Sequence, residues 1–178
     1  NQKYSDGASL SKTFSLMESN RDAILNMGRL AFENLEKGNV VFYERDLRQY
    51  GICLDTPSFY SGVCREIFQQ DSLSLHESVY SFTHLTLQEY FAALYVFACQ
   101  RNERRNVLKR QKGVFWLINP GSNLFSVFSS GLRKSIQNRN GHLDIFVRFL
   151  LGLSTKQNQN LLDGLFTIPL LSDVTELC

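Results

Sequence analysis

The alternation of apolar and polar residues predicts helices along most of this chain. After a polar, aperiodic start over residues 1–19, apolar residues recur at helical spacing from Arg21 to about Lys37. Asn20 is placed to N-cap this helix, and Gly38 suits the left-handed position after its last turn. The stripe that we expect to face the core consists of Ile24, Met27, Ala31 and Leu35, widened by Leu25, Leu30 and Phe32.

The next stretch predicts short elements. Val40–Phe42 has the pattern of an extended segment, and Tyr43–Tyr50 predicts a short helix that ends at Gly51. A third helix is expected over Ser58–Arg65.

A β-hairpin is predicted after these helices. Ile67–Leu73 and Ser78–Phe82 have the composition of two strands, and Ser74–Glu77 would form the loop between them. The helices and the hairpin are then followed by one more helix, described next. This order of elements is typical of a winged-helix domain.

The strongest helical pattern follows the hairpin. Thr86 and Glu89 have the spacing of a capping box, in which the hydroxyl and the carboxylate satisfy backbone N–H groups at the helix start. The apolar residues then recur at helical intervals, so that one stripe should hold the helix in the core: Leu87, Tyr90, Phe91, Leu94, Tyr95 and Ala98.

Beyond Gln100 the pattern is entirely helical. The expected helices are Asn102–Lys112, Asn123–Gln137, His142–Leu153, and a last one capped by Ser154 or Thr155 that ends near Phe166, before Pro169. In the expected helix His142–Leu153, only Asp144 and Arg148 interrupt an otherwise apolar surface. We therefore expect this helix to pack between neighbouring helices. We therefore predict a mainly α fold, with a winged helix followed by a superhelical array of helix pairs.

Composition narrows the class of protein. Of the 178 residues 43% are hydrophobic and 20% charged, a globular balance, and the net charge of +2 does not indicate nucleic acid. No run reaches the roughly 18 apolar residues that a membrane span needs. The chain starts at Asn1 without a signal sequence, which favours a piece of a longer protein.

Catalytic and metal-binding motifs are missing from the sequence. It contains no P-loop, dinucleotide-binding glycine motif, nucleophile elbow or HExxH, and its histidines (His76, His84 and His142) fall in different predicted elements. The cysteines (Cys53, Cys64, Cys99 and Cys178) lack zinc-site spacing, and Cys99 should be a buried free thiol in a reducing compartment. We therefore expect no enzyme and no metal site.

His84 is the candidate binding residue. It precedes the strongest helix, whose N-terminus carries partial positive charge and free N–H groups that attract phosphate. An imidazole here could donate a hydrogen bond to the phosphate of a nucleotide that another domain holds. The alternative is a partly buried histidine bonded to a backbone carbonyl.

The densest charge is a basic run of Arg101, Arg104, Arg105, Lys109, Arg110 and Lys112. It could face nucleic acid, an acidic partner or water. Binding of DNA by the winged helix is not favoured, because the expected reading helix, Ser58–Phe68, has only Arg65 as a basic residue and the hairpin has none.

Ser81–Phe97, SFTHLTLQEYFAALYVF, resembles the closing segment of the winged-helix domain in NOD-like receptors, the NACHT and leucine-rich-repeat proteins. Leu30–Ile52 and Tyr60–Phe68 are also similar to that domain, and His142–Leu165 resembles the second helical domain. The likeness is greatest to the CARD-type-3-like subgroup that is expanded in fishes.

This resemblance implies an organisation and a function. Residues 1–19 would connect to an upstream NACHT ATPase, 20–100 would form the winged helix, and 101–178 the second helical domain leading to leucine-rich repeats. His84 would contact the β-phosphate of ADP held by the NACHT domain and keep the receptor closed. The parent protein would bind ADP or ATP with Mg, reside in the cytoplasm and form a homo-oligomer on activation, whereas this chain alone would hold no cofactor.

Overall fold

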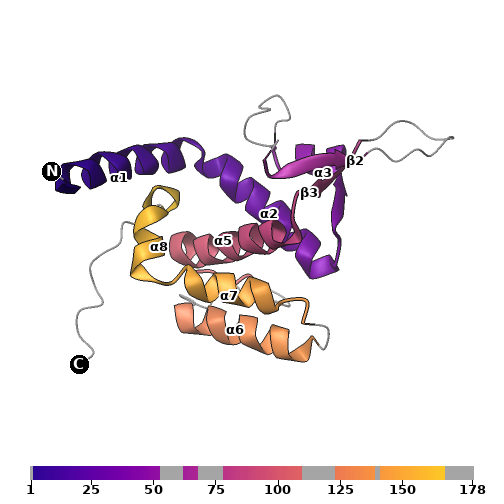
Figure 1. Ribbon diagram of the computed structural model, residues 1–178. Coiled ribbons are helices and arrows are strands. Elements are labelled where there is room, and N and C mark those ends of the chain that lie inside the picture. The colour runs from indigo at the N-terminus through magenta and orange to yellow at the C-terminus, as the bar shows by residue number, and fades with distance from the viewer. Residues whose placement is uncertain (1, 53–61, 68–77, 110–122, 139–140, 167–178) are drawn as a thin grey trace.

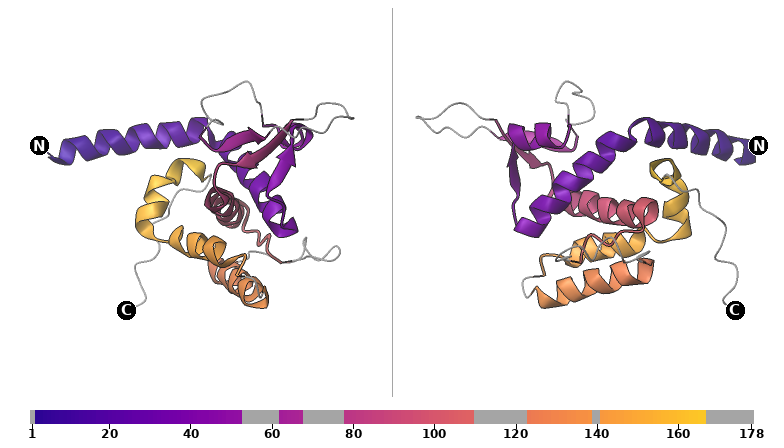
Figure 2. Two further views of the ribbon diagram at one scale, coloured as in Figure 1. Left: turned by 45° about the vertical axis from the view of Figure 1, so that its right-hand side comes forward. Right: turned by 180° about the vertical axis from the view of Figure 1, so that it is seen from behind.

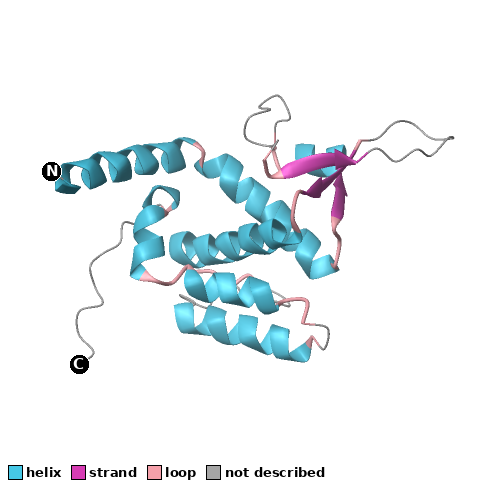
Figure 3. Cartoon of the chain, in the orientation of Figure 1, coloured by secondary structure: helices cyan, strands magenta, loops and turns pink. Residues whose placement is uncertain are grey.

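Helices dominate the structure, a computed structural model that describes residues 2–52, 62–67, 78–109, 123–138 and 141–166. The mainly α prediction is thus confirmed (Figure 3). In chain order the elements are α1 (Gln2–Ser19), α2 (Arg21–Lys37), β1 (Val41–Tyr43), α3 (Glu44–Gln49), β2 (Cys64–Ile67), β3 (Val79–Phe82), α5 (Leu85–Glu103), α6 (Leu124–Gln137), α7 (Asp144–Gly152), α8 (Lys156–Leu161) and the 3-10 turn η2 (Asp163–Leu165).

Helix α5 lies at the centre of the molecule (Figure 1). It packs against α2 on one side and against α7 on the other, while α6 covers the far side of α7. The small sheet stands at the N-terminal end of α5, and η2 packs on α1 at the other end of the molecule, as the two further views in Figure 2 also show. One helix therefore contributes to the packing of both halves of the chain.

The crossing of α2 and α5 is unusually close at Gly28. A methyl group added to Gly28 would lie 2.9 Å from the carbonyl oxygen of Phe91 and 3.0 Å from Cβ of Tyr95. The predicted stripe of α2 faces this contact, and Met27, Leu30 and Ala31 are fully or almost fully buried. The absence of a side chain at Gly28 thus permits the two backbones to approach.

The sheet has three antiparallel strands in the order β1-β3-β2. Val41 pairs with Ser81 and Cys64 pairs with Phe82, so β3 is the central strand. The predicted extended segment and second hairpin strand are confirmed to within one residue. Pairing of β1 with β3 was not predicted, because it joins residues far apart in the sequence.

The expected helix Ser58–Arg65 is wrong at its C-terminal end. Cys64 and Arg65 belong to β2, which begins three residues before the predicted strand start at Ile67. Nε of Arg65 donates to Oγ of Ser81 on β3, so this cross-strand pairing, rather than local helical spacing, determines the conformation. Residues 58–61, the predicted strand Ile67–Leu73 beyond Ile67, and the hairpin loop Ser74–Glu77 lie outside the described residues.

Helix α2 has the predicted bounds, whereas the last helix is shorter than predicted, because α8 ends at Leu161 and the 3-10 turn η2 follows it. Asn20 and Thr155 occupy the predicted N-cap positions, but neither side chain caps its own helix. The amide nitrogen of Asn20 donates to the carbonyl of Leu16 at 2.9 Å, and Oγ1 of Thr155 donates to the carbonyl of Gly152 at 3.0 Å. Each side chain therefore satisfies the end of the preceding helix rather than the start of its own. Gly38, with φ of 72°, does end α2 as expected.

Residues 2–19 form the helix α1, although their aperiodic sequence predicts a connector. Tertiary contacts explain why an amphipathic stripe is not required: a methyl group on Gly164 of η2 would lie 2.5 Å from the carbonyl oxygen of Phe14. Arg21 adds hydrogen bonds from Nε and Nη2 to the carbonyl of Gly164, at 3.2 and 3.0 Å. The end of α1 and the start of α2 thus both pack against η2.

The predicted charged helix Asn102–Lys112 is wrong in its described part. Helix α5 continues to Glu103 and ends at Arg104, whose φ of 53° is left-handed. The chain then turns towards α6, where the amide of Asn106 donates to the carbonyl of Ser126 at 3.0 Å and Leu108 is buried. Burial of Leu108 and the hydrogen bonds of Asn106 compensate for the helical bonds that are lost.

The remaining helices agree with prediction. Helix α6 starts at Leu124, and the side chain of its N-cap Asn123 accepts a hydrogen bond from the backbone of Ser126. Helix α7 lies between α5 and α6, as its apolar surround predicted, although Ile145 and Leu151 are each 39% exposed. Within the described residues, no helix combines the length and the apolar character of a membrane span.

Candidate functional site

His84 occupies the N-cap position of α5. Its backbone is extended, with φ of −138° and ψ of 141°, and its side chain is exposed and makes no capping hydrogen bond. The imidazole is therefore available at the surface. A histidine within hydrogen-bond distance of a backbone carbonyl does occur in the described chain, but it is His142, whose Nε2 lies 3.1 Å from the carbonyl oxygen of Leu35.

The backbone on both sides of His84 is anchored to distant segments. The N–H of Thr83 donates to the carbonyl of Val63 at 2.9 Å, and the Thr83 hydroxyl donates to the carbonyl of Gly62 at 3.2 Å. One turn into the helix, the amide of Gln88 donates to the carbonyl of Asn39 at 2.9 Å and is almost fully buried. These bonds fix the direction in which α5 begins.

An aromatic cluster lies beneath this helix start. Phe82 and Phe91 are buried with ring centroids 6.3 Å apart, and Phe42 of β1 meets the edge of Phe82 at 5.4 Å. The predicted stripe of α5 is confirmed as buried or half-buried along its whole length. His84 is thus an exposed side chain on a rigid support.

The electrostatics of the helix start favour an anion. The first turn of α5 contains no acidic residue, and the leading N–H groups of any α-helix lack intrahelical acceptors. Leu85 beside His84 is 59% exposed, and Thr86 is also exposed. A ligand here would need further walls from another domain.

The capping box expected at Thr86 and Glu89 is wrong. Because the helix begins at Leu85, Thr86 already lies inside the first turn, and Glu89 is too far along to reach the N-cap. Glu89 instead lies near His142, which precedes α7. Burial raises the pKa of the Glu89 carboxyl, and the neighbouring His142 offsets part of this increase.

We expect Glu89→Gln to stabilise the fold at neutral pH. Since the pKa of Glu89 in the folded state lies above its ordinary value of 4.5, the folded state binds this proton more tightly, and stability is lost as pH rises through that pKa. Urea unfolding at several pH values from acidic to neutral should show that the free energy of unfolding of Glu89→Gln falls less steeply with rising pH than that of the wild type. Glu66→Gln, at an exposed carboxylate of β2, is the control and should keep the wild-type slope; equal slopes for wild type and Glu89→Gln would contradict this account.

The basic run is dispersed rather than continuous. The guanidinium of Arg101 lies over the ring of Phe166 at 5.8 Å, Arg104 forms the left-handed end of α5, and Arg105 pairs with Glu103 at 2.7 Å. Arg110 and Lys112 lie outside the described residues. The described members of the run do not form one face of a helix.

The described cysteines are inert thiols. Cys99 is buried and free, as predicted, and burial raises its pKa to about 11 and that of Cys64 to about 12. Both are therefore protonated at neutral pH and poor nucleophiles. Cys53 and Cys178 lie outside the described residues, and among the described ones no cluster of His, Cys, Asp and Glu could hold a metal ion.

Two family models match the chain in succession. Residues 22–82 match the NOD2 winged helix domain, and residues 84–177 match the NLRC4 helical domain HD2. The two matches meet at Thr83, directly before His84. The predicted succession of a winged helix and a second helical domain is therefore confirmed.

Known proteins are similar to this chain over most of its length. It is 33% identical, over 81% of its length, to human NLR family CARD domain-containing protein 3, and 28% identical, over 80%, to mouse NACHT, LRR and PYD domains-containing protein 3. The chain spans about 13% of the length of each relative.

Proposed function

This chain belongs to the NOD-like receptor (NLR) family, and from that premise we propose that it is the part of such a receptor that reads the state of a bound nucleotide. In this proposal His84 donates a hydrogen bond to the β-phosphate of ADP, which an upstream NACHT ATPase domain holds. The contact keeps the receptor closed. Its loss on nucleotide exchange permits opening and homo-oligomerisation.

The observation that carries this proposal is the exposed imidazole of His84 on an anchored helix start. An N-terminus without an acidic residue in its first turn attracts phosphate, and the imidazole adds a directed donor. The bonds of Thr83 and Gln88 to other segments hold the backbone that carries that donor in one place, which favours a phosphate contact. The NACHT domain of the parent protein, in the cytoplasm, would hold the nucleotide with its Mg ion.

The helical half would couple this contact to the leucine-rich repeats. Helix α5 runs from His84 into the core of the second half and packs against α7. A displacement of its N-terminus would therefore be transmitted to α6, α7 and the segments that follow. No catalytic role is assigned to the chain in this scheme.

His84→Ala tests the proposal in the full-length receptor. The variant should retain less ADP through purification and signal more strongly at rest, because one phosphate contact of the closed state is lost; roughly a tenfold weaker retention is expected for a hydrogen bond to a charged group. Leu85→Ala, at the exposed neighbour, should behave as wild type. His84→Gln, which keeps a donor, should restore part of the ADP. Unchanged ADP content and resting activity in His84→Ala would refute the proposal.

A winged helix that binds nucleic acid is supported less well. Arg65, the basic residue of the described β2–β3 pair, is already bonded to Ser81, and the described basic run is dispersed. Weak binding of DNA that vanishes at about 0.2 M salt would indicate only non-specific attraction.

A further inference from the structure

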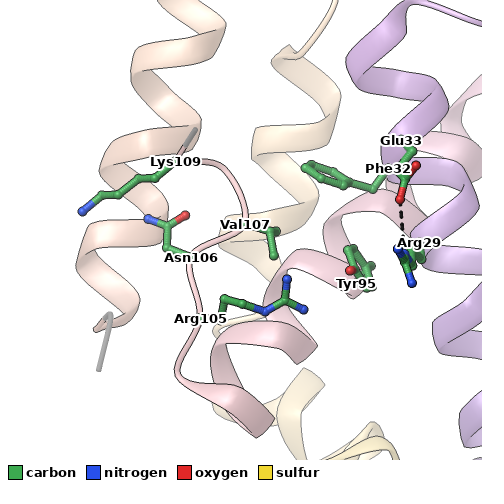
Figure 4. A pocket seen from close by; sticks show the side chains of 8 residues that line it. All are labelled: Arg29, Phe32, Glu33, Tyr95, Arg105, Asn106, Val107 and Lys109. Carbon is green, nitrogen blue, oxygen red and sulfur yellow. Dashed lines mark hydrogen bonds and ion pairs between the residues drawn. The ribbon is translucent and has the colours of Figure 1, made fainter. Parts of the chain in front are cut away.

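The helix end at Arg104 creates a groove that the sequence did not indicate. Because the chain turns there, Arg105 and Lys109 of the following loop come to line a cavity with Arg29 of α2 and Tyr95 of α5. Its volume is about 310 Å³. Figure 4 shows Arg29, Tyr95 and Arg105 gathered around this cavity, from α2, α5 and the loop.

The two arginines keep donors that their ion pairs do not use. Arg29 contacts Glu33 through Nε at 3.2 Å, so its terminal nitrogens stay out of that pair. Glu33 also accepts a hydrogen bond from the Tyr50 hydroxyl at 2.6 Å, which divides its charge between two donors. Arg105 donates from Nε to Glu103 and from Nη2 to Sγ of Cys99, and a further side-chain hydrogen bond joins it to Tyr95, so that its guanidinium is held at the edge of the groove.

The lining of the groove is positively charged. It comprises Arg29, Arg105 and Lys109 with the carboxylate of Glu33, and Glu103, which pairs with Arg105 at 2.7 Å, brings the net charge of these groups to +1. Glu103 itself lines a neighbouring cavity of about 360 Å³, which shares Arg29, Tyr95 and Arg105 with this groove. The cations come from two separated segments of the chain, so the arrangement differs from a solvated basic helix face.

We propose that this groove binds a phosphate monoester. The positively charged lining attracts the phosphate, and guanidinium groups donate to phosphate oxygens through paired N–H bonds. The volume lies at the lower end of small-molecule sites, about 300–1,000 Å³, which leaves room for the group that bears the phosphate. That group is either a phosphorylated side chain or a sugar phosphate, which share this chemistry.

The site is separate from the phosphate contact proposed for His84. His84 directly precedes α5 and Arg105 is the second residue after it, and the helix between them has 19 residues, about 28 Å at 1.5 Å each. The two proposals can therefore fail independently. The groove also gives Arg105 and Lys109, from the unassigned basic run, a common function.

NMR titration of the 178-residue chain tests the proposal, with inorganic phosphate, O-phosphoserine and glucose 6-phosphate as probes. The Nε–Hε signals of Arg29 and Arg105 should shift and saturate, whereas chloride at equal ionic strength should leave them in place. Arg29→Gln should weaken binding roughly tenfold, since it removes a charged donor. Lys109→Gln, at an exposed side chain, should weaken it less and without harm to the fold.

Arg133→Gln is the matched control, because it removes the same charge from an exposed position on α6. It should bind each probe as wild type does. Tighter binding of O-phosphoserine would identify a phosphorylated protein side chain as the ligand, and tighter binding of glucose 6-phosphate a sugar phosphate. Shifts spread over all basic residues, or equal weakening in Arg29→Gln and Arg133→Gln, would overturn the proposal.

Discussion

Phe97→Ala should lower the free energy of unfolding by about 3–5 kcal/mol, the usual cost of removing a buried aromatic ring. Phe97 is completely buried in α5, and its ring meets the edge of Phe166 with centroids 5.7 Å apart. Phe166 in turn follows η2, which Arg21 and Gly164 hold against the N-terminal helices. The cavity left by Phe97→Ala would therefore weaken the contact between α5 and the segment that follows η2.

Urea unfolding followed by circular dichroism measures this effect. Phe97→Leu should cost less, because it retains part of the buried volume. Phe125→Ala is the control, since Phe125 is 77% exposed on α6 and its removal leaves no cavity. If Phe97→Ala and Phe125→Ala unfolded at the same urea concentration, the described packing of Phe97 would be wrong.

Gly28→Ala should destabilise the fold by about 1–3 kcal/mol, the range expected for overpacking. Helix propensity alone predicts the opposite, since alanine in a helix is favoured over glycine by about 1 kcal/mol. The added methyl would lie 2.9 Å from the carbonyl oxygen of Phe91, and neither backbone at this crossing can move without displacing its helix. Steric conflict therefore outweighs propensity.

Gly152→Ala is the matched control for the direction of this stability change. It changes a glycine at the end of α7 where a methyl group meets nothing within 4 Å, so it should be neutral or stabilising. Thermal unfolding should show a lower midpoint for Gly28→Ala and an unchanged or higher midpoint for Gly152→Ala. A stabilised Gly28→Ala would show that α2 and α5 do not approach as closely as described.

Much of the candidate site could be predicted from sequence. The apolar stripe from Leu87 to Ala98 and the position of His84 before a helix follow from local spacing, and both are found in the structure. The capping role of Glu89 could not be predicted reliably, because the same Thr-x-x-Glu spacing occurs whether the helix begins at Leu85 or two residues later. The exact start depends on Gln88, whose partner Asn39 is 49 residues away.

The groove at Arg29 shows a second limit of local reasoning. Consecutive charges from Arg101 to Lys112 resemble an exposed helix face, and only the burial of Leu108 and the bonds of Asn106 to α6 break that helix. These contacts involve residues that lie about 20 positions further along the chain. The convergence of Arg105 with Arg29 follows from the break and could not be predicted.

Sequence by itself determined the helices with a clear apolar stripe, such as α2, α5 and α7, and the family that the chain resembles, because helical periodicity and motifs act over a few neighbouring residues. The tertiary structure alone decided the helicity of α1, the third strand of the sheet, and the fact that Asn20 and Thr155 satisfy the preceding helix. Each of these depends on backbone groups finding partners that spacing does not specify. His84 illustrates both cases. Its position before a helix could be predicted from the sequence, but its exposure next to an anchored backbone became evident only from the tertiary structure.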